Sequence, residues 1–471
     1  MAIPSMSSGR TAATEPRGPR SSRAPYWLFL GFMALVALTG GTSRYDSVTQ
    51  VLVRSAALAA MAGWVLLPGF GRAEAMRWPF VFLALIATTI AIQLIPLPPG
   101  IWTSLAGHEF YASVSTAAGL PVPWRPINLS PERGWSAFFS LVVPLATLVG
   151  LSRMSERRRL MLVLPLIALV LVSAVLGLGQ LSGGASSALR WYEYSDPFAG
   201  GFFANRNHQA ALLAMVLPLV AVWAMERRED DDRQRYRGAM AAGIGAFVLL
   251  MIPTTGSRAG FVLSFVSLIG ALVLAAPAIR RWYRRLPRRR RRTALGFVAG
   301  AVVVFVVVAV VFGRNDSLSR LQGLDATQDL RARTLPTVIQ LTGNFFPIGS
   351  GIGSFDAVYR RFEPFNLLST NYLNLAHNDF VQVVMEAGIA GAALIVLFIG
   401  WWLLRTVQVW RAPTSAIVRT GRAGSIIILL ALAASAVDYP LRTALMMMVF
   451  TIAAVWLEQA GRTPKTALLT G

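Results

Sequence analysis

The sequence predicts an all-α protein that crosses a membrane about twelve times. Its 471 residues are 55% hydrophobic and have a mean hydropathy of +0.55, unlike a soluble domain. Several apolar runs approach the roughly 20 residues that a helix needs to cross about 30 Å of hydrocarbon. The chain has no cysteine, which excludes disulfides, thiolate catalysis and cysteine-bound zinc.

The apolar segments divide the chain into five parts. A Ser-, Pro- and Arg-rich N-terminal tail at 1–25 is predicted to be disordered and cytoplasmic. Segments one to nine occupy 26–313, a large outer loop with short helices occupies 314–379, segments ten to twelve occupy 380–457, and a cytoplasmic tail follows at 458–471. The predicted spans are 26–41, 49–67, 78–96, 135–151, 160–180, 208–225, 239–253, 259–279, 294–313, 380–404, 423–437 and 441–457.

The distribution of charge predicts the orientation of these spans. With the N-terminus inside, the cytoplasmic segments carry 30 of the 44 basic residues and 9 of the 22 acidic residues, a balance of +21 out of a net +22. This asymmetry follows the positive-inside rule. The arginine run 288–292 is therefore interpreted as an anchor at anionic lipid headgroups, and nucleic acid is not expected as a partner.

Outer segments longer than a tight turn are expected at 97–134, 181–207 and 314–379. Within the largest, Arg331–Gln340 has the pattern of a helix lying along the membrane surface, and Gly349–Gly353 that of a turn. His108, in the first of these loops, is expected at the surface.

In this topology, polar and ionisable residues whose burial in a bilayer is energetically unfavourable gather at the outer face. Arg206 and His208 open the sixth segment, Arg258 opens the eighth, and Arg54 and Glu386 lie inside the second and tenth. Ionisable groups inside a bilayer are functional candidates by default. For Arg54 and Glu386 the alternative is an ion pair that holds two helices together.

Arg206 and Arg258 are candidates for anion binding. Guanidinium groups bind phosphate oxygens through two parallel hydrogen bonds, and a helix N-terminus adds amide donors for the same anion. Three helices, the sixth, eighth and tenth, are predicted to begin on the outer side.

The stretch at 371–391 carries the candidate base. His377, Asn378 and Asp379 precede the tenth apolar segment, and histidine occurs only two other times. An imidazole at the mouth of a membrane helix is a candidate proton acceptor, although it could also simply cap the helix. Gly388 and Gly391 share a helix face and are expected to allow close approach of a neighbouring helix.

This stretch resembles the signature of the O-antigen ligase and O-antigen polymerase superfamily. The shared pattern is His-Asn, nine residues, Gly, two residues, Gly, at His377, Asn378, Gly388 and Gly391. Further segments are similar to others of that superfamily, namely ANRNH around Arg206, GSRAG around Arg258, RARTL at 331–335, FPIGSGIGSF at 346–355 and VDYPLR at 437–442. Ligases are described with Arg, three residues, Leu; Val262 follows Arg258 at that place, whereas Arg331 is followed by Leu335.

The resemblance implies a metal-independent glycosyltransferase of the bacterial inner membrane with a GT-C-like fold and no cofactor. Its donor would be a glycan on undecaprenyl pyrophosphate at the periplasmic side, and its acceptor lipid A–core for a ligase or a growing glycan for a polymerase. His377 would be the base, and Arg206 and Arg258 would bind the pyrophosphate. His208, Asn378, Arg331, Arg54 and Glu386 are the further residues predicted to bind substrate.

Two other readings remain open at this point. An exopolysaccharide chain or a protein serine could be the acceptor. A transporter of lipid-linked glycans is the alternative from another class of protein, although transporters usually show related halves and broken helices near the midplane. The Asp230–Asp232 run has the spacing of a metal-dependent transferase but lies among arginines, which indicates a solvated cytoplasmic loop.

Overall fold

The structure is a computed structural model that describes residues 23–67, 76–192, 198–226, 231–293, 326–368 and 373–462, together with the isolated positions 296, 300 and 307. Over these ranges the regular elements are all helices, and an isolated bridge joins Leu97 to Arg125. The predicted all-α class is therefore confirmed. Of the tails predicted at 1–25 and 458–471, residues 1–22 and 463–471 lie outside the described residues, whereas α1 already begins at Ala24 and α18 continues to Gly461.

Eleven of the twelve predicted spans coincide with described apolar helices. The N-terminal group comprises α1 (Ala24–Thr39), α2 (Val48–Leu66), α3 (Arg77–Gln93), α6 (Pro131–Ser140) continued by α7 (Val142–Ser152), and α8 (Glu156–Met161) continued by α9 (Val163–Ser182). The remainder comprises α10 (Arg206–Met225), α11 (Asp231–Thr254), α12 (Arg258–Arg285), α16 (Asp379–Arg411), α17 (Ala416–Ser435) and α18 (Ala444–Gly461). The span predicted at 294–313 falls almost wholly outside the described residues.

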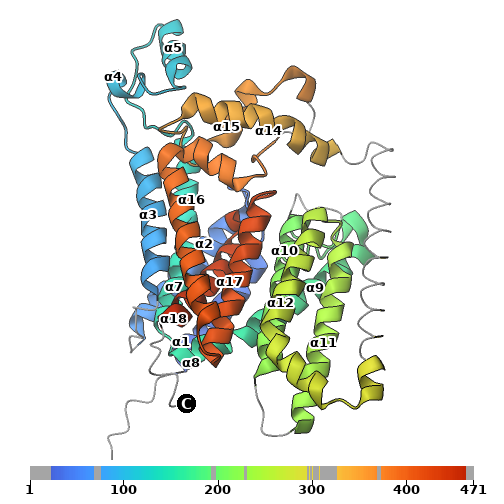
Figure 1. The fold of residues 1–471 in the computed structure, drawn as a ribbon. Coiled ribbons are helices and arrows are strands. Elements are labelled where there is room, and N and C mark those ends of the chain that lie inside the picture. Colours follow the sequence, from blue (N-terminus) through green and yellow to red (C-terminus); the bar gives the residue numbers. More distant parts are fainter. Residues whose placement is uncertain are drawn as a thin grey trace, which may run out of the picture.

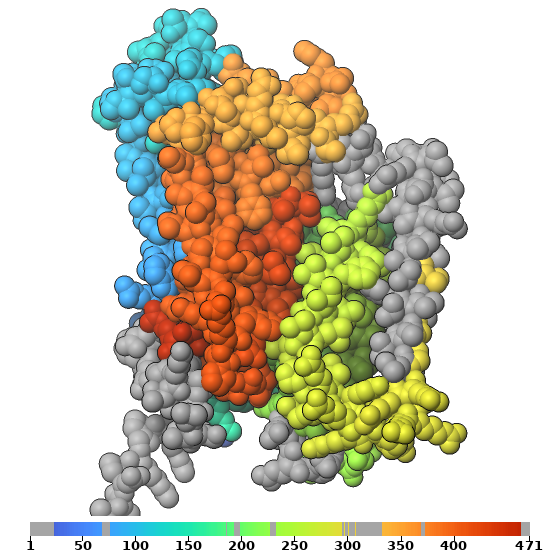
Figure 2. All heavy atoms as spheres, in the orientation of Figure 1, coloured from blue at the N-terminus to red at the C-terminus, as the bar shows by residue number. Residues whose placement is uncertain are grey.

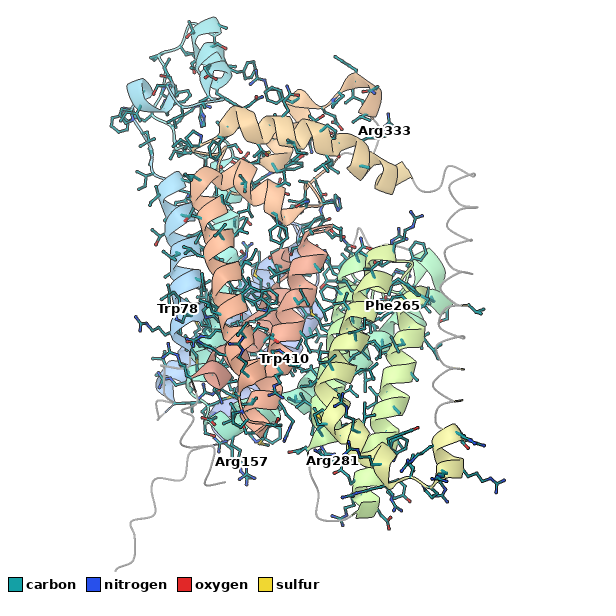
Figure 3. The ribbon with its side chains drawn as sticks, in the orientation of Figure 1. Trp78, Arg157, Phe265, Arg281, Arg333 and Trp410 are labelled. Atoms are coloured by element: carbon teal, nitrogen blue, oxygen red, sulfur yellow. The ribbon has the colours of Figure 1, made fainter. Side chains whose placement is uncertain are left out.

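Nine of the described helical spans are long and apolar enough to cross a membrane, and α1 and α3 are shorter apolar helices. The protein is therefore a multi-pass membrane protein. As predicted, α10, α12 and α16 begin at the same end of the bundle (Figure 1). Arg157 and Arg281 lie at the opposite end from Arg333 (Figure 3), in keeping with the predicted asymmetry of charge.

Helices α10, α17 and α18 form the centre of the bundle, and α17 packs against both of the other two. Small residues allow these close approaches. A side chain at Gly421 would collide with Ala460 of α18, and one at Gly260 of α12 would collide with Ala210 of α10. Close contact between helix backbones thus stabilises the bundle and brings together the ends of helices that are far apart in the sequence.

A layer of short helices covers the outer end of α16. It contains α14 (Ala326–Phe345) and α15 (Phe355–Phe362), and α14 lies across the end of the bundle (Figures 1 and 2). Its own apolar core includes Phe345, Phe355 and Tyr359. The helix predicted over Arg331–Gln340 is confirmed, but it extends further at both ends.

The backbone of α16 is interrupted at Gly388, which has φ 56° and ψ −138°. The outer layer is inserted there: Ile389 N donates to Pro347 O at 2.8 Å, and Gly351 N donates to Glu386 O at 2.8 Å. A Cβ at Gly388 would collide with the Pro347 carbonyl. The prediction that Gly388 lets a neighbouring helix approach is therefore wrong, because the close neighbour is a loop backbone and the helix does not continue through this residue.

Candidate functional site

A buried carboxylate, Asp438, gathers the polar residues at the outer end of the bundle. It lies between α17 and α18 and is 2% exposed. Its oxygens accept from His377 Nδ1 at 3.2 Å and from Asn207 Nδ2 at 2.6 Å, and Asn205 Nδ2 lies at 3.4 Å. Asp438 therefore joins the N-termini of α10 and α16 to the connection between the last two helices.

His377 is held in an unusual backbone conformation. Its φ of 52° is the one positive value among the described non-glycine residues. Such conformations are sparsely populated for residues with a side chain and cluster at functional sites. The Tyr439 ring lies 4.8 Å from the imidazole, centroid to centroid, and the His377 side chain retains 12% exposure. Packing, strain and a carboxylate thus orient an imidazole that substrate can still reach.

The hydrogen bond to Asp438 also selects the tautomer of His377. A neutral imidazole that donates from Nδ1 carries its lone pair on Nε2. The bond to a carboxylate additionally stabilises the imidazolium that forms when Nε2 takes a proton. The arrangement can therefore perform general-base chemistry.

Asn378, rather than His377, caps α16. Its Oδ1 accepts from Val381 N at 3.2 Å, which satisfies one of the amide donors at the start of the helix. The expectation that His377 caps the helix is therefore wrong. Asn378 was predicted to bind substrate, and the structure gives its side-chain oxygen this structural partner.

His208 lies behind Asp438 and not at an open surface. It is 1% exposed, its Nε2 is 3.7 Å from Asp438 Oδ1, and its ring packs edge-on against Tyr439 at 5.2 Å. This position suits a residue that holds Asp438 better than one that contacts a donor. His208 was predicted to bind substrate, and its burial favours the supporting role.

The surroundings of Asp438 favour its ionised form. Burial by itself would raise the pKa, but the hydrogen bonds from His208 and His377 outweigh it and hold the pKa of Asp438 well below its usual range. The carboxylate therefore stays charged beside His377 at neutral pH.

Arg206 and Arg258 each occupy the first position of a capped helix. Asn205 caps α10 by accepting from Asn207 N at 2.8 Å, and Ser257 caps α12 by accepting from Gly260 N at 3.0 Å. The Arg206 guanidinium stacks 4.2 Å above the Phe198 ring and lies beside Gly256, two residues before Arg258. The structure thus places both arginines on adjacent helices at the end that carries Asn205 and Asn207.

Arg442 interacts with two carboxylates near the start of α16. Its Nε donates to Asp379 Oδ1 at 2.7 Å, and its Nη2 lies 3.7 Å from Glu386 Oε2. Glu386 is fully buried and also accepts from Phe355 N at 3.2 Å and Gln382 Nε2 at 3.0 Å. A substrate contact by Glu386 would require the bundle to open, so its geometry indicates a structural carboxylate that supports the break in α16.

Arg54 does not pair with Glu386, contrary to the ion pair considered as an alternative. Its Nη2 donates to Ser136 Oγ at 2.9 Å, and it lines a cavity that Arg442 also lines. Arg331 lies in α14, where its side chain falls outside the described ones. His108, expected at the surface, is fully buried and its ring nitrogens bond to the carbonyls of Ala106 and Ile127 at 3.1 and 2.9 Å.

The contribution of Asp438 was not identified as part of the site from the sequence. Its signal in the sequence was a lone acid in the short hairpin between two apolar segments, within VDYPLR. Asn205, Asn207 and Tyr439 were not singled out either. Among the described residues, no three of His, Asp and Glu gather as they would around a metal ion.

The fold and this site define a multi-pass helical membrane protein with a His–Asp pair and two helix-initiating arginines at one end. Residues 243–396 match the O-antigen ligase family, a range that includes Arg258, His377 and Asn378. This part of the chain is therefore similar to the O-antigen ligase family, which supports the resemblance of the sequence motifs to the O-antigen ligase and O-antigen polymerase superfamily.

A curated relative of this chain carries the name of a glycosyltransferase. The chain is 27% identical over 258 residues to a probable peptidoglycan glycosyltransferase, FtsW, of Thioalkalivibrio sulfidiphilus. The match covers 53% of this chain and 54% of the relative, so the chain spans about half the length of the curated relative it matches.

Proposed function

We propose that this protein transfers a glycan from undecaprenyl pyrophosphate to a hydroxyl of an acceptor such as lipid A–core, at the periplasmic face of the bacterial inner membrane. The observation that carries the proposal is the His377 Nδ1–Asp438 Oδ1 hydrogen bond of 3.2 Å, at the end of the bundle where α10 and α12 begin with arginine. The family match and the relative with a glycosyltransferase name support it.

In the proposed reaction the acceptor oxygen attacks the anomeric carbon as that carbon's bond to the phosphate oxygen breaks. His377 Nε2 takes the hydroxyl proton, and the electron pair of the broken bond leaves with undecaprenyl pyrophosphate. Asp438 stabilises the imidazolium, and His208, Asn205 and Asn207 hold Asp438. Direct displacement inverts the anomeric centre.

Arg206 and Arg258 bind the leaving pyrophosphate in this proposal. Each guanidinium offers paired donors, and both helix N-termini direct their positive ends toward the same compartment. Preorganised cations stabilise the charge that develops on the leaving group without reorganisation at the moment of reaction. Stacking on Phe198 fixes the plane of Arg206. The arginines thereby supply charge that a metal ion supplies in other transferases.

A transfer assay with His377→Asn tests the base. Asparagine tolerates positive φ, so this variant keeps the local backbone while it removes the imidazole. We expect transfer from isotope-labelled lipid-linked donor to fall by about 10²- to 10⁴-fold, the usual contribution of general-base catalysis. Insertion into the membrane and binding of the donor should persist. Transfer at the wild-type rate in this variant would exclude His377 as the base.

The same assay separates an enzyme from a transporter, because only an enzyme forms a new covalent product. The acceptor class is read from the surface glycan of a deletion strain. Chains that remain on the lipid carrier and are missing from lipid A–core identify a ligase. Accumulated single repeats identify a polymerase.

A further inference from the structure

A small basic cavity lies beside the His377 segment, and neither Arg206 nor Arg258 is among the residues that line it. Its volume is about 160 Å³, and Asn374, Leu375 and Arg442 form part of its wall. Leu375 precedes His377 by two residues, and Arg442 bonds to Asp379 two residues beyond it. The wall of the cavity therefore includes the segment that precedes His377 and the arginine that bonds to the residue two positions after it.

The wall of this cavity carries a net positive charge. Its ionisable side chains are four arginines and two aspartates, a balance of +2: Arg44, Arg54, Arg133, Arg442, Asp46 and Asp356. Arg44 pairs with Asp46 at 2.9 Å, and Arg133 pairs with Asp356 at 2.5 Å. Each aspartate is thus already paired with an arginine, and Arg442 is paired with Asp379, which lies outside the wall, at 2.7 Å. The charge that has no carboxylate partner among the described residues is therefore that of Arg54.

Arg54 is the cation that the local structure satisfies least. Among the described residues no carboxylate lies within ion-pair distance of it, and its hydrogen-bond partner is the neutral Ser136 Oγ. Its Nε is buried and has no partner in the described structure. A cation with an unmet donor at a cavity wall indicates that an anion completes the site.

The size of the cavity limits what can enter. Ligand pockets for whole small molecules measure about 300–1,000 Å³. A cavity of about 160 Å³ accommodates one anionic group with a few waters, so the ligand's remainder must lie outside. Ser136, Ser140, Gln50 and Tyr45 add neutral donors to the wall.

The number of donors favours a phosphomonoester over other anions. A phosphomonoester offers three terminal oxygens, which can accept from the Arg54 guanidinium and from the hydroxyl groups of Ser136 and Tyr45. A phosphodiester or a carboxylate offers two terminal oxygens and would leave more of these donors without an acceptor.

Resting on the proposed function, we propose that this cavity binds a phosphomonoester of the acceptor and thereby positions the acceptor hydroxyl at His377. The donor's diphosphate would lie at Arg206 and Arg258, which do not line this cavity. Each of the two substrates would then be held by its own arginines.

The test compares Arg54→Gln with Arg360→Gln. Arg360 also bonds to Asp356, at 2.6 Å, but does not line the cavity, so it is a matched loss of one charge. Transfer is measured with a phosphorylated acceptor and with the same acceptor after phosphatase treatment. We expect Arg54→Gln to raise the KM for the phosphorylated acceptor by about 10- to 100-fold, as a lost charged hydrogen bond does. The KM for the donor, and that for the treated acceptor, should stay unchanged.

Equal losses on both acceptors, or an unchanged KM on the phosphorylated one, would overturn the proposal. Arg54→Lys provides a second variant if Arg54→Gln does not fold, because it keeps the charge and loses the fork; it should raise the same KM by a smaller factor.

A binding experiment without transfer distinguishes failure of this proposal from failure of the proposed function. The thermal stability of wild type, Arg54→Gln and Arg360→Gln is measured with inorganic phosphate, glucose 1-phosphate or phosphatidic acid in nanodiscs. Stabilisation by glucose 1-phosphate that is lost only in Arg54→Gln supports a sugar phosphate even in a protein that shows no transfer. Stabilisation by phosphatidic acid alone would assign the cavity to a membrane lipid, and stabilisation by inorganic phosphate alone to a free ion; each overturns the acceptor role. No stabilisation by any probe, together with unchanged kinetics, overturns the cavity as an anion site.

Discussion

A buried carboxylate lies at each end of the bundle, Glu458 at the inner end and Asp438 at the outer end, and the partners of these two carboxylates differ. At the inner end Glu458 of α18 is fully buried and bonds to Arg405 at 2.8 Å, Arg462 at 2.6 Å and Trp401 Nε1 at 3.0 Å. At the outer end Asp438 bonds to histidine and asparagine. Arginine keeps its charge at every accessible pH, whereas histidine gains and loses a proton near neutrality.

The same chemical group, a buried carboxylate, thus has different surroundings at the two ends. Two permanent cations make Glu458 a fixed connection between α16 and α18. In the proposed mechanism His377 gains a proton, so the interaction between Asp438 and this partner changes during the reaction. The partner, more than the burial, decides which carboxylate can take part in proton transfer.

Removing the charge of Asp438 at the outer end should have the largest effect on the rate of transfer. In Asp438→Asn the shape is kept, but the amide neither selects the Nδ1–H tautomer of His377 nor stabilises the imidazolium. We expect transfer to fall by about 10²-fold or more, as other His–carboxylate pairs do. The acid limb of the pH–rate profile should also move to lower pH, because the histidine loses a neighbouring negative charge. An unchanged rate and profile would show that Asp438 is no different in kind from Glu458.

Exchanging the cation at the proposed pyrophosphate site should have a smaller effect. Arg258→Lys keeps the charge but loses the paired donors, so we expect transfer to fall by about 10-fold. Arg281→Lys is the matched control, since it changes the same residue type on the same helix at the opposite end. Equal activity in the two variants would rule out bidentate recognition at Arg258.

The inner carboxylate should affect stability and leave catalysis unchanged. In Glu458→Gln the charged hydrogen bonds to Arg405 and Arg462 are lost. Because both guanidinium groups reach solvent, at 15% and 30% exposure, we expect a cost of about 1–3 kcal/mol and not the larger penalty of a sealed ion pair. The apparent Tm in detergent measures the cost, and transfer per folded molecule should match wild type. A loss of turnover comparable to that of Asp438→Asn would remove the distinction between the two ends.

The smallest effect is expected in the pH dependence of the Tm, to which the charge of Asp438 contributes. The pKa of Asp438 is lower in the folded protein than in the unfolded chain, so its ionised form contributes stability that is complete above about pH 4. That contribution is lost as the pH falls through the lower folded pKa. The Tm difference between wild type and Asp438→Asn should therefore narrow below about pH 4. A difference that is independent of pH across this range would show that Asp438 does not stabilise the fold through its charge.

Much of the architecture could be predicted from the sequence because a bilayer permits few alternatives. Each spanning segment must satisfy its own backbone, so apolar runs of sufficient length become helices. The positive charge of the connecting segments then orients them. These two constraints placed Arg206, Arg258 and His377 at the same end of the bundle before any tertiary contact was known.

Partnerships between side chains could not be predicted in the same way. The sequence does not show that His377 meets Asp438, 61 residues later, or that Glu386 lies near Arg442 while Arg54 faces a cavity. The break in α16 at Gly388 was missed for the same reason, since a loop from the outer layer supplies the hydrogen bonds that the helix gives up.

The sequence by itself therefore determined the membrane class and the shared end of the bundle at which Arg206, Arg258 and His377 lie, and it predicted the orientation. The tertiary structure alone decided which carboxylate orients the imidazole, which histidines are buried, and where Arg54 lies, which has no carboxylate within ion-pair distance among the described residues. The physical reason is that apolar helix faces look alike whether they contact lipid or another helix. Packing of small residues, such as Gly421 against Ala460, selects the neighbours and so brings the polar side chains together.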